Sequence, residues 1–219
     1  MDWQKKSQPF NERAEEYDSW FENSLLFDLE LAALKAINVN LPRPRLEIGV
    51  GPGRFAKELN VDFGIDPAIS ALQLASRRSI IGINGIGENL PFQTGSMGTI
   101  FILFTLCFLS DPAAVFTECS RIIKPDGRLV IGLIPSQSNW GKLLAEKGRN
   151  NHPFYRHARM RTIAESIELL KQNDFSVKES WSTLVQVPGN KIIHEAPQLG
   201  MNENAGFCVL VTSKKGDAR

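Results

Sequence analysis

The stretch LEIGVGPGR at residues 46–54 decides the fold of this chain. An apolar run that contains one acidic residue leads into three glycines at alternate positions, and a helical pattern begins at Phe55. Glycine has no Cβ, so such a turn can bend sharply and lets bare backbone approach a ligand. The first N–H groups of the next helix have no partner within it and face the same place. The pattern predicts a small-molecule binding loop between the first strand and first helix of a doubly wound sheet.

Strands and helices alternate along the chain after this turn. Strands are expected at residues 61–65, 80–83, 99–105 and 128–134, and helices at residues 55–59, 67–78 and 112–123. The segment 99–105 is an unbroken apolar run, which is typical of a parallel strand buried on both faces. This alternation predicts an α/β fold whose parallel sheet has helices on both faces.

The last third of the chain has a different pattern. A helix is expected at residues 162–173, a strand at 175–186 and another strand at 206–212. Because no helix separates these two strands, we expect an antiparallel hairpin at one edge of the sheet. The connecting residues 187–205 are longer than most loops of compact domains, and such a length is more common in functional loops.

The N-terminal region is helical in pattern, with apolar and aromatic residues at spacings of three and four from Phe10 to Asn38. Its Tyr17, Trp20 and Phe21 suit either a lid over a ligand or the packed face of an ordinary amphipathic helix. We expect one domain over residues 1–219. Its parts are an N-terminal helical arm or lid at 1–40, a ligand-binding core at 41–135, and substrate-side insertions with the C-terminal hairpin at 136–219.

The composition narrows the class of protein. Of the 219 residues 42% are hydrophobic and 22% charged, which suits a globular core, and the net charge of +1 argues against general nucleic-acid binding. The longest apolar run, residues 100–109, is too short to cross a bilayer, and the first residues lack a signal-peptide pattern. We therefore expect a cytoplasmic protein without nucleic-acid or membrane partners. The three cysteines, Cys107, Cys119 and Cys208, are expected to be free buried thiols.

Four segments occur in an order that one enzyme family shares. They are LEIGVGPGRFA at 46–56, Asp66-Pro67, GENLPF at 87–92 and RIIKPDGRLVIG at 121–132. Together they resemble the class I S-adenosylmethionine-dependent methyltransferases, and the similarity extends over residues 17–212. Three further segments are similar to a subgroup of small bacterial and archaeal members: YDSWF at 17–21, TLCFLSDP at 105–112 and HPFYRHAR at 152–159. The resemblance implies a Rossmann-like, doubly wound, seven-stranded sheet in the order 3-2-1-4-5-7-6, with strand 7 antiparallel.

The resemblance also implies which residues hold S-adenosyl-L-methionine. Asp66 ends the second strand, where a carboxylate can accept both hydroxyls of a ribose, although the same side chain can also cap the following helix. Gly49, Gly51 and Gly53 would let the backbone approach the methionine part of the cofactor; the alternative is a tight turn without a ligand. Glu47 interrupts an apolar strand, and burying it unpaired would be costly, so the cationic groups of the cofactor are its expected partners.

The remaining expected cofactor contacts follow the later motifs. They are Tyr17, Pro67, Gly87, Glu88, Thr105, Leu106 and Cys107. Gly87-Glu88 resembles the family loop that borders adenine, but the acidic residue that usually precedes this position is absent. Adenine recognition is therefore expected to depend on backbone and apolar contacts. Cys107 has no base nearby in the sequence to activate it, so we expect a wall residue and not a nucleophile.

No motif specifies a catalytic residue. A sulfonium cofactor already carries an activated methyl group, so a general base is needed only when the accepting atom holds a proton at neutral pH. His152, Tyr155 and His194 are the candidates for that role. Residues 139–161 hold six Lys or Arg and one acid, which suits either an anionic substrate or a solvated face. The spacing of His152 and His157 does not suit a helical metal pair, so no metal site is expected.

The predicted function is S-adenosyl-L-methionine-dependent transfer of a methyl group to a small molecule by in-line displacement. A small acceptor is favoured because the sequence shows no added recognition domain and no broad basic surface. Two alternatives remain open. One is an NAD(P)-binding Rossmann oxidoreductase, which would usually have a glycine where Arg54 stands. The other is a catalytically silent methyltransferase-like module that binds the cofactor without turnover.

Overall fold

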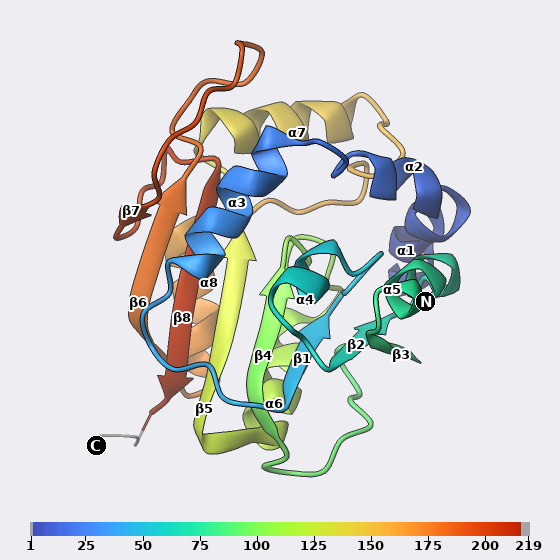
Figure 1. The fold of residues 1–219 in the computed structure, drawn as a ribbon, viewed down its shortest axis with the longest axis vertical. Coiled ribbons are helices and arrows are strands. Elements are labelled where there is room, and N and C mark those ends of the chain that lie inside the picture. Colours follow the sequence, from blue (N-terminus) through green and yellow to red (C-terminus); the bar gives the residue numbers. More distant parts are fainter. Residues whose placement is uncertain (1, 216–219) are drawn as a thin grey trace.

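Figure 1 shows the fold in a computed structural model of the chain, which describes residues 2–215. An eight-stranded sheet has the strand order β3-β2-β1-β4-β5-β8-β6-β7. The strands are β1 (Arg45–Ile48), β2 (Phe63–Asp66), β3 (Ile81–Asn84), β4 (Met97–Leu103), β5 (Ile123–Leu133), β6 (Phe175–Thr183), β7 (Gln198–Leu199) and β8 (Phe207–Lys214).

The sheet has a parallel part and an antiparallel edge. Strands β3, β2, β1, β4 and β5 are parallel, and β8 lies antiparallel between β5 and β6. This arrangement confirms the predicted Rossmann-like sheet, because the last two long strands take the places of strands 7 and 6. The two-residue β7 is an addition. It arises in the segment expected to be a loop and pairs with Trp181 and Ser182 of β6.

Helices cover both faces of this sheet. They are α1 (Asp2–Glu12), α2 (Ala14–Ser19), α3 (Leu25–Lys35), α4 (Arg54–Glu58), α5 (Ile69–Arg77), α6 (Pro112–Ile122), α7 (Asn139–Arg149) and α8 (Ile163–Gln172). Helices α6 and α8 contribute to the core on one face, and α3, α4 and α5 contribute to the core on the other. Figure 1 shows α3 and α4 in front of the sheet and α6 behind it.

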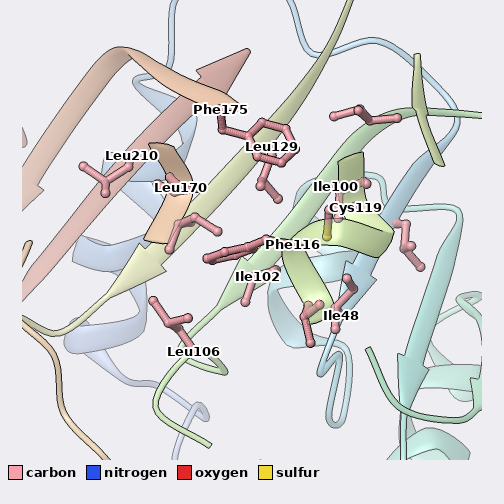
Figure 2. Close-up of a cluster of buried hydrophobic side chains, with 14 of the residues drawn as sticks. Ile48, Ile100, Ile102, Leu106, Phe116, Cys119, Leu129, Leu170, Phe175 and Leu210 are labelled. Atoms are coloured by element: carbon pink, nitrogen blue, oxygen red, sulfur yellow. The ribbon is translucent and has the colours of Figure 1, made fainter. Parts of the chain in front are cut away.

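The central strand β4 serves both cores. Its Ile100 and Ile102 point to one face while Phe101 and Leu103 point to the other, as the two-residue period of a strand requires. Figure 2 shows the first of these cores, where Phe116 of α6 lies beside Ile102. All seven residues of β4 are buried, which confirms the expected buried strand over residues 99–103, whereas Phe104 and Thr105 lie beyond its end and are half-buried.

Three regions differ from the predicted elements. Strand β5 begins at Ile123 and not at residue 128. The helical pattern at 10–38 is three helices, because Arg13 leaves the helical conformation (φ −127°, ψ 36°) and Asn23 has φ 51° just before the Ser24 N-cap. Helix α7 occupies part of the basic segment 139–161, for which no helix was expected. No helix among residues 2–215 combines the length and apolar character needed to cross a membrane.

Candidate functional site

Two adjoining cavities lie beyond the carboxyl ends of β1 and β4. The first, named here the glycine-loop cavity, is lined by residues 47–52, 54 and 55, the end of β2, residues 86–88, residues 103–105 and 108–110, and side chains of α1 and α2. The second, named here the aromatic cavity, lies between α2, α3, α7 and residues 152–161. Its volume of about 360 Å³ exceeds the 120 Å³ of the first, so it has room for a small organic molecule. Both cavities are lined by Phe10, Tyr17, Phe21, Phe104 and Phe108.

The glycine turn forms one wall of the first cavity. Gly49, Gly51 and Gly53 all have positive φ values, of 73°, 51° and 77°, which residues with a Cβ adopt at a cost. A Cβ on Gly49 would lie 2.2 Å from Oγ1 of Thr105, so the close approach of these two segments requires glycine. A Cβ on Gly51 would meet only a ring carbon of Tyr17, at 3.7 Å, and the Gly51 backbone lines the cavity.

Asp66 ends β2 at the edge of the glycine-loop cavity. One carboxylate oxygen accepts a hydrogen bond from the Gly51 N–H at 2.9 Å, and the other accepts from the Ala68 N–H at 2.8 Å. Burial raises the pKa of Asp66 to about 6, although these two backbone donors act in the opposite direction. The N-cap of α5 is Ala68 and not Asp66, so the carboxylate holds the turn before this helix, and its remaining lone pairs are available to a ligand in the cavity.

Glu47 presents a buried acid to the same cavity. It is 3% exposed, and its Oε2 atom has no hydrogen-bond partner among the described residues. Desolvation and the nearby carboxylate of Asp66 raise its pKa well above the ordinary range. An unsatisfied carboxylate oxygen in a ligand cavity is costly to the free protein, so the geometry suits a ligand that brings a cationic group.

The structure brings most of the predicted cofactor residues together. Tyr17, Glu47, Gly49, Gly51, Asp66, Pro67, Gly87, Glu88 and Thr105 line the glycine-loop cavity. Leu106 and Cys107 line the aromatic cavity instead. Gly53 lines neither, because its position is used for packing: a Cβ there would lie 3.0 Å from the Cβ of Ala75 in α5.

Cys107 lines the aromatic cavity, and its surroundings do not activate its thiol. Its thiol donates to the carbonyl oxygen of Phe104, and burial raises its pKa to about 12. A thiol with such a pKa stays protonated at neutral pH and is a poor nucleophile. Among the described residues no group of His, Cys, Asp and Glu is arranged to hold a metal ion.

The three candidates for a base occupy different places. His152 and Tyr155 line the aromatic cavity, with their rings 5.0 Å apart. Burial raises the pKa of Tyr155, and burial together with Lys147 lowers the pKa of His152. His194 is exposed on the segment before β7 and borders neither cavity. Its neighbour Glu195 accepts hydrogen bonds from Thr183 and the Val185 N–H, so it ties this segment to the end of β6.

The N-terminal arm is anchored to the glycine turn by one buried acid. Asp18 of α2 accepts two hydrogen bonds of 2.7 Å from Arg54 and one of 2.9 Å from Arg78. Burial alone would raise the pKa of Asp18, but the two guanidinium groups outweigh it and hold this pKa below its ordinary value. Arg78 also donates to the carbonyl oxygen of Pro52, so the anchor includes the turn itself. Arg54 stands where a dinucleotide-binding turn would usually have glycine.

We expect Asp18→Asn to loosen the arm while leaving the sheet intact. Hydrogen bonds between charged groups contribute about 1.5–3 kcal/mol each, and a neutral amide cannot satisfy both arginines. Limited thermolysin digestion should therefore cleave the arm faster in the variant than in the wild type. Glu16→Gln, which removes only the exposed pair with Arg13, is the matched control on the same helix. Equal digestion of Asp18→Asn and wild type would contradict the anchoring role.

Several residues that line the two cavities belong to no sequence motif and were not predicted. Trp3, Lys6 and Ser7 of α1 line the glycine-loop cavity, and Glu30 of α3 lines the aromatic cavity. The sequence does hold a signal for Glu30, since it lies one helical turn from both Leu26 and Leu34 and so interrupts an apolar row. For α1 the signal is absent, because its residues are mostly polar and reach the cavity only through the tertiary fold.

Comparisons with known proteins identify the class of protein. A family profile described as a methyltransferase domain matches residues 46–131. An uncharacterized protein of Mycobacterium tuberculosis is 40% identical over 198 residues, which cover 89% of this chain and 70% of that protein. An uncharacterized protein of Methanocaldococcus jannaschii is 37% identical over 177 residues, which cover 80% of this chain and 84% of that protein.

A solved structure from Thermotoga maritima has nearly the same fold. It superposes with a TM-score of 0.87 at 29% sequence identity, over 98% of this chain and 100% of that one. That protein is described as an S-adenosylmethionine-dependent methyltransferase and a "possible histamine N-methyltransferase". The family profile and this solved structure support methyl transfer, and they give no support to the oxidoreductase that the glycine turn alone left open.

The chain belongs to the class I S-adenosylmethionine-dependent methyltransferases. It is an enzyme of that class, and S-adenosyl-L-methionine is its cofactor. The residues that line the glycine-loop cavity have chemical groups that can bind this molecule. The unpartnered Oε2 of Glu47 fits a cationic amino group, and the free lone pairs of Asp66 fit a ribose diol.

Proposed function

We propose that this chain is a cytoplasmic enzyme that methylates a small, largely apolar molecule bound in the aromatic cavity. The observation that carries the proposal is the shared aromatic wall. Tyr17, Phe21 and Phe104 border both cavities, so a molecule in the second cavity would lie beside the cofactor in the first. Residues 1–219 would then act as one catalytic unit, with an arm at 1–40, a cofactor-binding core at 41–135 and acceptor-side segments at 136–219.

The protein's part in the proposed reaction is binding, orientation and exclusion of water. When bound, the sulfonium cofactor supplies an activated methyl group, and in-line displacement requires the acceptor atom to face it. Well-oriented reactants can lower a barrier by about 7–11 kcal/mol through positioning alone. The cofactor contacts in this proposal are the predicted residues that line the glycine-loop cavity: Tyr17, Glu47, Gly49, Gly51, Asp66, Pro67, Gly87, Glu88 and Thr105. Packed rings of the arm, such as Phe10 and Tyr17 at 5.1 Å, support exclusion of water.

A base is proposed only for acceptors that carry a proton at the reacting atom. Tyr155 and His152 border the acceptor cavity and are the candidates for it. His194 is not a candidate for the base, because this exposed residue lies outside both cavities. An anionic acceptor is a second candidate, supported by Lys147, Arg159 and Arg161 along the aromatic cavity.

Calorimetry with S-adenosylhomocysteine and with NADH tests the cofactor assignment. We expect S-adenosylhomocysteine to bind with a dissociation constant on the order of micromolar and NADH not to bind at all. Binding of NADH in its place would overturn the proposal. Incubation with methyl-labelled cofactor and a fractionated metabolite extract then tests transfer. Tight cofactor binding without label in any fraction would favour a silent binding module instead.

A further inference from the structure

One acidic side chain lines the aromatic cavity, and no residue among 2–215 forms an ion pair with it. Glu30 of α3 lines this cavity, and its carboxylate forms no hydrogen bond or salt bridge within the part of the chain that the structure describes. The neighbouring acid Asp28 is exposed on the same helix, so α3 places one acid in water and one in the cavity. Glu30 is half-buried, and a carboxylate that loses part of its hydration among apolar walls without gaining a partner destabilises the free protein, which suggests that a ligand completes it.

The cations of the cavity do not serve this carboxylate. Lys147 and Arg159 are exposed, and Arg161 is buried but donates to the carbonyl oxygens of Leu106 and Arg159. None of them is among the charges that shift the pKa of Glu30, which burial raises to about 8. The negative charge of Glu30 instead contributes to the raised pKa values of Tyr17 of α2 and of Tyr155.

The surroundings of Glu30 favour a positively charged or N–H-bearing ligand. The walls of the cavity include the rings of Phe27, Phe104 and Trp140, together with those of the two tyrosines. Aromatic faces attract ammonium groups, and a carboxylate accepts their hydrogen bonds. A carboxylate or phosphate ligand at the same place would meet a like charge. The exposed cations therefore lie at the edge of the cavity, while Glu30 determines which ligand charge the interior of the cavity favours.

We propose that Glu30 makes the aromatic cavity selective for small apolar or aromatic acceptors that carry a basic nitrogen. The proposal rests on the function proposed above and names the substrate class of the same site. Glu30 acts as a specificity-determining residue that pairs with the nitrogen of the acceptor. An ammonium beside it would favour the ionised carboxylate, so binding at about pH 7 should release about one proton to the buffer. The other titratable groups that line the cavity are Tyr17, Cys107, Lys147, His152, Tyr155, Arg159 and Arg161.

The test uses three probes of similar size and different charge. They are 2-phenylethylamine, 2-phenylethanol and 3-phenylpropionate, each titrated calorimetrically into the protein saturated with S-adenosylhomocysteine. We expect the amine to bind about tenfold or more tightly than the alcohol or the acid. In Glu30→Gln this preference should disappear, and Asp28→Asn on the same helix should keep it. Proton release, measured in buffers of different ionisation enthalpy, should be lost in Glu30→Gln alone.

Thermal unfolding shows whether Glu30→Gln is folded. Burial raises the folded-state pKa of Glu30 from 4.5 to about 8, so its contribution to stability is lost as the pH rises through that window. The variant should therefore be at least as stable as the wild type at about pH 8. Equal or tighter binding of the alcohol or the acid, an unchanged preference in Glu30→Gln, or no detectable amine binding would overturn the inference. Failure of S-adenosylhomocysteine to bind would instead refute the proposed function.

Discussion

Asp66→Ala is expected to weaken binding of S-adenosylhomocysteine by about a hundredfold or more, because two hydrogen bonds to a charged carboxylate contribute about 1.5–3 kcal/mol each. The structure adds a second consequence. The carboxylate also accepts from the Gly51 and Ala68 N–H groups, so the variant should unfold at a lower temperature while keeping its circular dichroism spectrum. Isothermal titration calorimetry measures the first effect and thermal unfolding the second.

A control near Asp66 separates ribose binding from a general effect on the end of β2. Asn84 of β3 donates to the carbonyl oxygens of Asp66 and Pro67, but its side chain does not line the glycine-loop cavity. We expect Asn84→Ala to change the affinity by no more than about twofold. An Asp66→Ala protein that binds S-adenosylhomocysteine as tightly as the wild type would disprove the ribose assignment.

Glu47→Gln is expected to make the free protein more stable and cofactor binding weaker. The amide removes a buried carboxylate whose Oε2 has no partner, which should raise the free energy of unfolding by about 1–3 kcal/mol near neutral pH. The same change removes the negative charge that would face the amino group of the cofactor. Binding of S-adenosylhomocysteine should therefore weaken about thirtyfold.

The pH dependence gives this prediction a definite sign. The pKa of Glu47 is raised above its ordinary value of 4.5 in the folded chain, so wild-type stability falls as the pH rises above that value. The stability gain of Glu47→Gln should accordingly grow with pH. Glu203→Gln is the matched control, since Glu203 also has a buried, unpartnered Oε2 but lines neither cavity. A Glu47→Gln protein with unchanged affinity would contradict the assigned partner.

The fold was largely predictable because the pattern of the sheet is local. Apolar strands that alternate with helices specify a parallel sheet, and residues 175–186 and 206–212 with no helix between them specify its antiparallel edge. The breaks within residues 10–38 were not predictable, because apolar spacing continues through them. They depend on backbone angles at Arg13 and Asn23. The short β7 was missed because two residues carry too little pattern to indicate a strand.

The site was predictable where the chain itself forms the ligand surface. The glycine turn and Asp66 lie within the consecutive elements β1, α4 and β2, so their proximity follows from one strand–helix–strand unit. Glu30 was overlooked because its significance depends on packing: only the tertiary fold shows that α3 directs it toward Tyr155 and the aromatic rings. Cys107 faces the second cavity for a similar reason, since the turn after β4 decides its direction.

The five rings that border both cavities have a kinetic consequence. Phe10 and Tyr17 belong to the arm, and Asp18 latches that arm to the glycine turn. We infer that neither ligand can exchange freely while the latch is closed, and that opening it uncovers both cavities to water at once. Donor and acceptor would then assemble during one opening of the arm, and both products would leave during the next. The rate of turnover would then depend on one conformational change, the opening of the arm, and not on separate opening motions for donor and acceptor.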